Sequence, residues 1–183
     1  MKKILLVTAG YSIFDAKGQL NGFLSYLTDK TLSQKGHKVK ISDVTKDTLD
    51  MDRELDKLLW ADTIIYIMPM MWFNMPAPLV KWLDEVLQYE KTFIITDDYG
   101  EGGQIPATEF MIVTTSNMKK SDLGKGFVLK NAPHIDDLLQ PLIMTNHYLS
   151  IRKQHPTFHA DNVIAGETDW IEKDCIKHLN QYF

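Results

Sequence analysis

The segment MPMMWFNMPAPLVKWLDEVL, residues 68–87, joins the end of an apolar run to the start of a helical pattern. Just upstream, residues 63–68 are apolar and β-branched, which favours a parallel strand buried on both faces. Downstream, apolar side chains recur at the spacing of one helix face: Leu79, Trp82, Leu83, Val86 and Leu87. Pro76 and Pro78 suit the first turn of a helix, where backbone amides lack intrahelical partners. The segment therefore predicts a loop at the carboxyl end of a central strand.

The same alternation of strand and helix runs through the rest of the chain. Further strands are predicted at residues 4–7, 38–41, 110–114 and 148–151, and helical stripes begin near Leu20, Met51, Ile135 and Trp170. Right-handed crossovers then give a parallel sheet with helices on both faces. The half-polar strand at 38–41 should lie at an edge, which fits the strand order 2-1-3-4-5. The predicted fold class is α/β with a five-stranded sheet.

Composition narrows the class of protein. A length of 183 residues predicts one domain, residues 1–183. The net charge of -4 argues against nucleic-acid binding, and no apolar run reaches the ~20 residues of a membrane span. Four apolar residues after Lys3 are too few for a signal peptide, and a single cysteine, Cys175, fits a reducing compartment. We therefore expect a cytoplasmic protein.

Three loops follow the first, third and fourth predicted strands and should converge on one crevice. The first ends at GQLN, residues 18–21, where free helix amides would favour a phosphate; alternatively, Gly18 only turns the chain. The second, residues 70–75, carries methionine and aromatic side chains that a flat redox ring would cover, unless the loop packs on its own core or on a second subunit. The third, residues 115–117, offers donors to a polar ring edge.

Other chemistry is not indicated. His155 and His159 have the spacing of metal ligands on a helix, but Pro156 disfavours a helix between them. We predict no metal site. The serines lack the GxSxG context of a nucleophile elbow, and the chain has neither a GxGxxG nor a P-loop pattern.

The chain resembles the flavodoxin-like NAD(P)H:quinone oxidoreductases, most closely the bacterial family called modulator of drug activity B. The resemblance covers nearly the whole length. It rests on residues 18–21, 60–62, 68–69 with Trp72, the helix start at 78–84, the turn formed by 99–100 and 102–103, and Thr115 with Asn117. It implies a flavin site built from these residues: Ala16, Lys17, Gly18, Gln19, Leu20, Asn21, Pro69, Met70, Met71, Trp72, Phe73, Tyr99, Thr115, Ser116, Asn117 and Met118. Tyr99 would also shape the acceptor pocket and act in catalysis.

The activity implied by the resemblance is two-electron reduction of quinones by a bound flavin. FAD is expected ahead of FMN as the cofactor, with NADPH or NADH as the reductant. The family also implies a homodimer with the flavin at the subunit interface. Two alternatives use the same fold: a non-catalytic, flavin-binding regulatory subunit of the potassium-efflux type, and a flavodoxin-like electron carrier.

Overall fold

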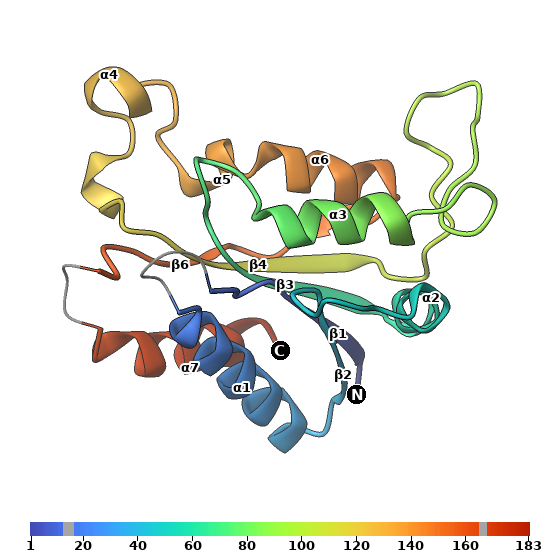
Figure 1. Ribbon diagram of the computed structural model, residues 1–183, viewed down its shortest axis with the longest axis horizontal. Coiled ribbons are helices and arrows are strands. Elements are labelled where there is room, and N and C mark those ends of the chain that lie inside the picture. Colours follow the sequence, from blue (N-terminus) through green and yellow to red (C-terminus); the bar gives the residue numbers. More distant parts are fainter. Residues whose placement is uncertain (13–16, 165–167) are drawn as a thin grey trace.

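Up to residue 115, strands and helices alternate along the chain, as the sequence predicts (Figure 1). The computed structural model describes residues 1–12, 17–164 and 168–183. The strands are β1 (Lys3–Thr8), β2 (Lys38–Asp43), β3 (Thr63–Pro69), β4 (Glu109–Thr115), β5 (Lys153–Gln154) and β6 (Phe158–Ala160). The helices are α1 (Gln19–Gln34), α2 (Met51–Trp60), α3 (Ala77–Val86), the 3-10 helix η1 (Lys120–Asp122), α4 (Gly126–Leu129), α5 (Ile135–Leu138), α6 (Gln140–Tyr148) and α7 (Trp170–Tyr182).

The sheet has six parallel strands, and five of them follow the predicted order 2-1-3-4-5. The half-polar strand β2 lies at the edge beside β1, as expected. The fully buried strands β3 and β4 lie in the middle. Because all described strand pairs are parallel, the carboxyl ends of β1, β3 and β4 share one edge of the sheet, toward the left in Figure 1.

The predicted fifth strand at residues 148–151 is wrong. Helix α6 continues to Tyr148, and Ser150 then turns the chain with a left-handed φ of 65°. The edge beside β4 is formed instead by β5 and β6, which flank Pro156. Proline has no amide to donate to a ladder, so one strand becomes two short ones, and the sheet has six strands rather than five.

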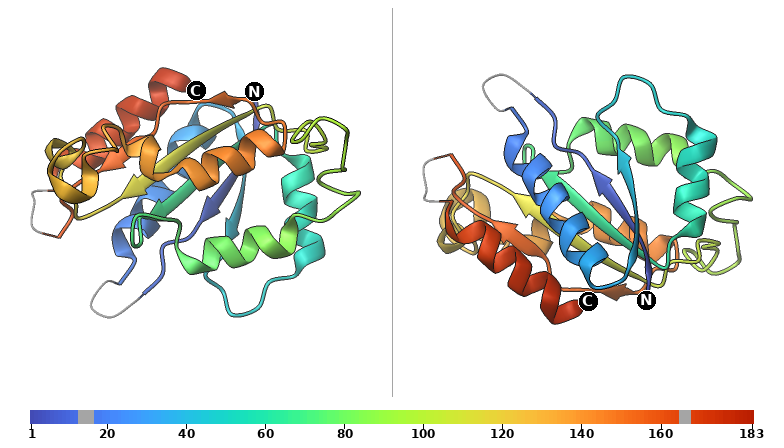
Figure 2. Two further views of the ribbon diagram at one scale, coloured as in Figure 1. Left: turned by 90° about the horizontal axis from the view of Figure 1, so that it is seen from above. Right: turned by 90° about the horizontal axis from the view of Figure 1, so that it is seen from below.

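Helices cover both faces of the sheet, and each face has its own core. Helices α1 and α7 pack on one face, which the view from below in Figure 2 shows in front. Helices α2, α3 and α6 pack on the other. Alternate residues of one strand serve the two cores: Ile65 faces α1 and α7, whereas Ile64 and Tyr66 face α2, α3 and α6. Within the described residues, no helix is both long and apolar enough to cross a bilayer.

Candidate functional site

A crevice opens where the three predicted loops meet at the carboxyl edge of the sheet. Its volume is about 550 Å³. The lining residues are Tyr11, Lys17, Gly18, Gln19, Leu20, Asn21, Pro69, Met70, Met71, Thr115, Ser116, Asn117, Val163 and Ile164. The structure therefore brings together residues from all three loops that the sequence predicts for one site.

Two glycines allow the first loop to fold tightly over the start of α1. Gly18 has a left-handed φ of 66°, and a Cβ on it would lie 2.9 Å from the carbonyl oxygen of Gly10. A Cβ on Gly10 would lie only 2.4 Å from the Cβ of Asn21. Larger side chains at either position would push the loop away from the helix.

The amino end of α1 offers free backbone amides to the crevice. The amide of Gly22 donates to the carbonyl of Gly18 at 3.0 Å, so Gln19, Leu20 and Asn21 precede the first intrahelical bond. No side chain among the described residues caps this end. Unsatisfied amides and the positive end of the helix dipole together favour an anion at this position.

Thr115, the last residue of β4, connects the other two loops to α1. Its hydroxyl accepts a hydrogen bond from Asn21 Nδ2 at 3.1 Å, and its carbonyl accepts one from the Met70 amide at 2.8 Å. The Asn21 side chain is buried, and its Oδ1 has no partner among the described residues. A buried acceptor without a donor is costly, so Oδ1 is suited to a donor that a ligand brings.

The loop after β3 is a two-residue turn with aromatic side chains at both central positions. Met71 and Asn74 exchange backbone hydrogen bonds of 2.9 Å, while Trp72 and Phe73 both have positive φ, 50° and 62°. This is the geometry of a type I′ turn, which normally takes asparagine and glycine. Trp72 is 94% exposed, and neither central amide donates a hydrogen bond within the described residues. The turn thus presents two free amides and an uncovered indole.

Ser116 continues the crevice wall beyond β4 and is bonded to β6. Its amide donates to the Ala160 carbonyl at 3.0 Å, and its Oγ lies 2.8 Å from His159 Nε2 and 3.2 Å from the Met118 carbonyl. Burial, helped by the nearby positive charge of Lys120, lowers the pKa of His159 to about 4, although Asp161 opposes the change. The imidazole is therefore neutral at neutral pH.

The remaining predicted residues lie around this crevice or away from it. Trp72 lines a neighbouring cavity of about 620 Å³ that shares Tyr11 and Met71 with the crevice. Phe73 and Met118 line neither cavity. The prediction for Ala16 falls outside the described residues.

Tyr99 is not near the crevice of its own chain. It lies in the long connection between α3 and β4, at the opposite end of the sheet (Figure 1). Its ring is 94% exposed, and its centroid lies 5.4 Å from that of Tyr148 in a separate cavity of about 460 Å³. Sequence resemblance can group residues that share a site without indicating whether one chain supplies them all.

Three crevice residues and one supporting residue were not predicted. Tyr11, Val163 and Ile164 line the crevice, and His159 bonds to Ser116 behind its wall. The apolar pair Val163-Ile164 in an otherwise polar loop is a signal that could have indicated a lining role. The contact of His159 could not be foreseen, because it depends on β6, a strand that the sequence pattern does not predict.

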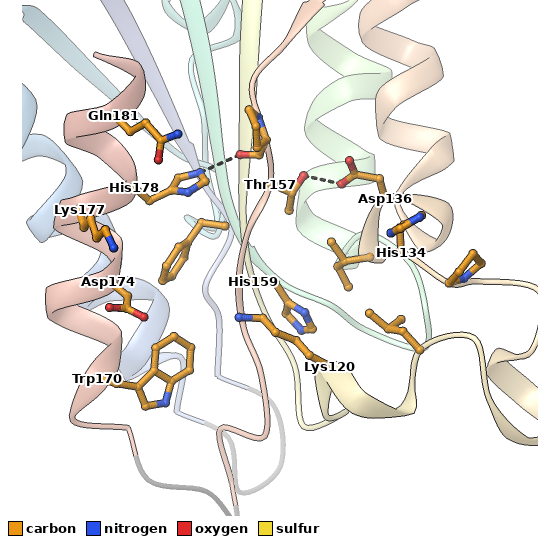
Figure 3. Close-up of a pocket in the computed structure, with 15 residues that line it drawn as sticks. Lys120, His134, Asp136, Thr157, His159, Trp170, Asp174, Lys177, His178 and Gln181 are labelled. Carbon is orange, nitrogen blue, oxygen red and sulfur yellow. Dashed lines mark hydrogen bonds between the residues drawn. The ribbon is translucent and has the colours of Figure 1, made fainter.

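Another cavity, of about 660 Å³, lies on the far side of β6, between α7 and α5 (Figure 3). Its wall is mixed and includes two hydrogen bonds: His178 Nε2 donates to the Pro156 carbonyl at 2.8 Å, and Thr157 Oγ1 donates to Asp136 at 2.5 Å. The three histidines at this cavity are His134, His159 and His178. Among the described residues, no group of histidine, cysteine and acidic side chains could hold a metal ion.

The fold and site define a class of protein: a parallel α/β fold with an uncapped helix start and an apolar, exposed loop on the carboxyl edge of its sheet. Ligands of such sheets bind at this edge. The chain belongs to the family described as having a flavodoxin-like fold, whose model matches residues 2–182.

Similar proteins agree with this assignment. The chain is 27% identical over 191 residues to the NADPH:quinone oxidoreductase MdaB of Haemophilus influenzae, with 98% of each chain covered. It is 29% identical to an FMN-dependent NADH:quinone oxidoreductase of Shewanella frigidimarina, over 63% of this chain and 70% of that one. The solved structure of an NAD(P)H:quinone oxidoreductase from Methanothermobacter marburgensis has the same fold, with a TM-score of 0.72, 14% identity, and 98% and 94% coverage.

Proposed function

We propose that this protein is a flavin-dependent NAD(P)H:quinone oxidoreductase. The observation that carries the proposal is the convergence of an uncapped helix start, a turn with free amides, and the end of β4 on one crevice. Several relatives, among them those of Haemophilus influenzae and Shewanella frigidimarina, are named as quinone oxidoreductases, and this supports the choice of reaction.

The crevice fits the chemical parts of a flavin nucleotide. The amides of residues 19–21 would hold a phosphate, and Asn21 Oδ1 would accept a hydrogen bond from a polyol hydroxyl. The apolar wall at Pro69, Met70 and Met71 would cover one side of the ring. A bound flavin supplies hydride transfer, and the free amides of Trp72 and Phe73 would stabilise negative charge near its polar edge.

A charge reversal at the helix start tests the phosphate position. Gln19→Glu places a carboxylate beside the free amides, where it favours the helix but repels a phosphate. We expect FMN affinity to fall by about tenfold, with no comparable change for riboflavin, which lacks the phosphate. An equal loss for both ligands would place the phosphate elsewhere. Fluorescence quenching of each ligand by flavin-free protein measures both affinities.

The substitution Trp72→Ala tests whether the turn at Trp72 and Phe73 contributes to flavin binding. We expect weaker flavin binding and an unchanged melting temperature of the flavin-free protein, because the indole is exposed and makes little contact with the core. Tyr26→Ala, which removes an exposed aromatic ring from α1 well outside the crevice, is the matched control. Retention of full flavin affinity by Trp72→Ala would contradict a role for this turn.

The flavin itself is FMN or FAD. The family resemblance favours FAD, but relatives whose names specify a flavin specify FMN, so FMN is the first expectation. Release of the cofactor by heat and determination of its mass distinguishes the two. The reductant is NADPH or NADH, and steady-state rates with each at matched concentration show which is preferred.

We also propose a homodimer in which the partner supplies Tyr99. The turn at Trp72 and the loop of Tyr99 lie at opposite ends of the face that carries α3 and α6 (Figure 1). A two-fold axis through that face would place each Tyr99 loop over the crevice of the other subunit. Apolar side chains are exposed at Ile95, Phe127 and Met144, and burial of this surface against a partner subunit would be favourable.

A measurement of turnover distinguishes an enzyme from a regulatory subunit. NAD(P)H oxidation in the presence of menadione supports the enzyme, whereas flavin binding with no turnover supports the regulatory subunit or the electron carrier. The buried position of the one cysteine, Cys175, fits a reducing compartment, so we propose the cytoplasm, which cell fractionation tests.

A further inference from the structure

His159 is a buried imidazole in contact with the wall of the crevice. It is 3% exposed and lies on β6, where its Nε2 is 2.8 Å from Ser116 Oγ. Its Nδ1 is buried and has no partner among the described residues. Figure 3 shows the ring next to Lys120, between the side chains of α7 and those of α5. A buried ring with one strong contact is held in place mainly by that contact.

The contacts of the Ser116 hydroxyl indicate which nitrogen of the His159 ring carries the hydrogen. A serine hydroxyl has one hydrogen, and Ser116 Oγ lies near two groups, Met118 carbonyl oxygen at 3.2 Å and His159 Nε2 at 2.8 Å. The carbonyl can only accept. If Ser116 donated to Nε2, its oxygen and the carbonyl would be two acceptors in contact. If Nε2–H donates instead, the serine hydrogen is free for the carbonyl, and both contacts are favourable.

We propose that His159 is a positioning residue that keeps the Ser116 hydroxyl available as a donor to the crevice. With Nε2–H donating to Ser116 Oγ, the serine hydrogen can turn from the Met118 carbonyl to an acceptor that enters the crevice. The inference rests on the proposed function, because it assigns the acceptor to the flavin ring. The chain of two donors from His159 to Ser116 polarises the hydroxyl and strengthens its bond to that acceptor.

The polarised Ser116 hydroxyl should affect binding of the reduced cofactor more than binding of the oxidised cofactor. Negative charge gathers on a flavin when it accepts hydride, so a polarised donor stabilises the reduced form more than the oxidised form. Because the His159 imidazole is neutral, it does not repel the positive charge of Lys120. It polarises the Ser116 hydroxyl without adding a charge of its own. Removing the imidazole should therefore weaken binding of reduced flavin more than binding of oxidised flavin.

The first test needs no flavin. Nitrogen-15 and proton NMR of the flavin-free protein reports which ring nitrogen of His159 is protonated, and we expect Nε2–H. Ser116→Ala should change the chemical shift of that proton, because its acceptor is lost. A spectrum that shows Nδ1–H in the wild-type protein overturns the inference.

The second test measures the midpoint potential of bound FMN. We expect His159→Leu to reduce the preference for the reduced form about tenfold, a shift of about 30 mV to lower potential for a two-electron couple. His159→Gln keeps an amide donor of similar reach and should stay close to wild type. Ser116→Ala should give the same shift as His159→Leu, and the double variant should add nothing further. Melting temperatures of the flavin-free variants confirm that each is folded.

The outcomes separate this inference from the proposed function. A wild-type protein that binds neither FMN nor FAD contradicts both. A protein that binds flavin, but whose potential is the same in wild type and in His159→Leu, contradicts only the role of His159. If His159→Leu does not fold, the comparison of Ser116→Ala with Ser116→Thr decides: equal potentials in these two variants overturn the inference, and a lower potential in Ser116→Ala supports it.

Discussion

Phe73 and Trp72 occupy a turn that their side chains do not favour. Left-handed backbone conformations cost roughly 1–2 kcal/mol per non-glycine residue, and the turn contains two in succession. Trp72 is almost fully exposed and Phe73 is about half exposed, so burial in the described structure offsets little of this strain. A strained, exposed aromatic turn at a ligand crevice indicates that ligand binding, rather than stability, determines its sequence.

The first prediction is that Phe73→Gly makes the flavin-free protein more stable and weakens its binding of flavin. Phe73→Gly relieves the left-handed strain, partly offset by the greater freedom of glycine in the unfolded chain, so the flavin-free protein should be stabilised by about 0.5–1 kcal/mol. Flavin affinity should fall, because the more flexible turn orders its amides less well. Urea denaturation and flavin titration measure the two effects. A destabilised flavin-free variant would show that Phe73 packs for stability.

At the scale of single residues, the sequence indicated which loops meet at one crevice, but not the hydrogen bonds between their residues. Gly18, Thr115 and Met70 were placed correctly at one crevice because the ends of parallel strands must meet. The bond of Ser116 to His159 could not be predicted, since it joins residues 43 positions apart through an unidentified strand. The distance of Tyr99 from the crevice was missed for a related reason: strand order does not reveal where a long connection projects.

Among the elements, a buried carboxylate at the amino end of β4 joins this strand to β3, to β5 and to the residue that precedes β1. Glu109 accepts hydrogen bonds from Thr63 of β3, Lys2 next to β1, and Lys153 of β5, and it contacts His155 Nε2 at 2.9 Å. Burial alone would raise the pKa of the carboxyl, but these hydrogen bonds together lower it to about 2. The cluster lies at the end of the sheet opposite the crevice and serves the fold.

The second prediction concerns acid stability. The folded pKa of Glu109 lies below its ordinary 4.5, so its stabilisation is complete above that value and is lost as pH falls toward 2. Glu109→Gln should lower the free energy of unfolding by about 2 kcal/mol at neutral pH and flatten the loss between those two values. Chemical denaturation across this range measures both effects.

The matched control for Glu109→Gln is Glu85→Gln. Glu85 is exposed and pairs with Lys81 at 3.4 Å on α3, so its loss should change stability by less than about 0.5 kcal/mol. Equal effects of the two substitutions would contradict the special role of the buried carboxylate.

The elements themselves were predictable where packing and pattern agree. Helix α2 and the edge strand β2 were read from simple periodicity. The prediction failed after residue 139, where one helical stripe divides into α5 and α6 with Pro141 in the first turn of α6. The apolar residues 149 and 151 serve the core without forming a strand. Apolar composition shows that a segment is buried, but not whether it is a strand.

At the scale of the whole molecule, the proposed dimer can be broken without touching the crevice. Met144 is 64% exposed on α6 and belongs to the face that we expect the partner to cover. Met144→Lys would bury a charge at that interface, so the protein should become monomeric in sedimentation experiments. Tyr26→Lys, on the opposite face, is the control and should stay dimeric. A wild-type protein that is already monomeric would contradict the dimer.

The prediction of one domain also has a direct test. Two cores on opposite faces of one sheet share the strands between them, so they should unfold together. Calorimetry of the flavin-free protein at low concentration should show one transition whose calorimetric and van't Hoff enthalpies agree. Two separate transitions would contradict a single cooperative unit.

The central claim is that the carboxyl ends of β1, β3 and β4 hold a flavin. It is tested most directly by adding FMN to the flavin-free protein, removing free ligand, and measuring the absorbance and mass of what stays bound. We predict a yellow protein with about one flavin per chain, reduced in affinity by Gln19→Glu. A colourless wild-type protein after incubation with FMN and, separately, with FAD would contradict the account.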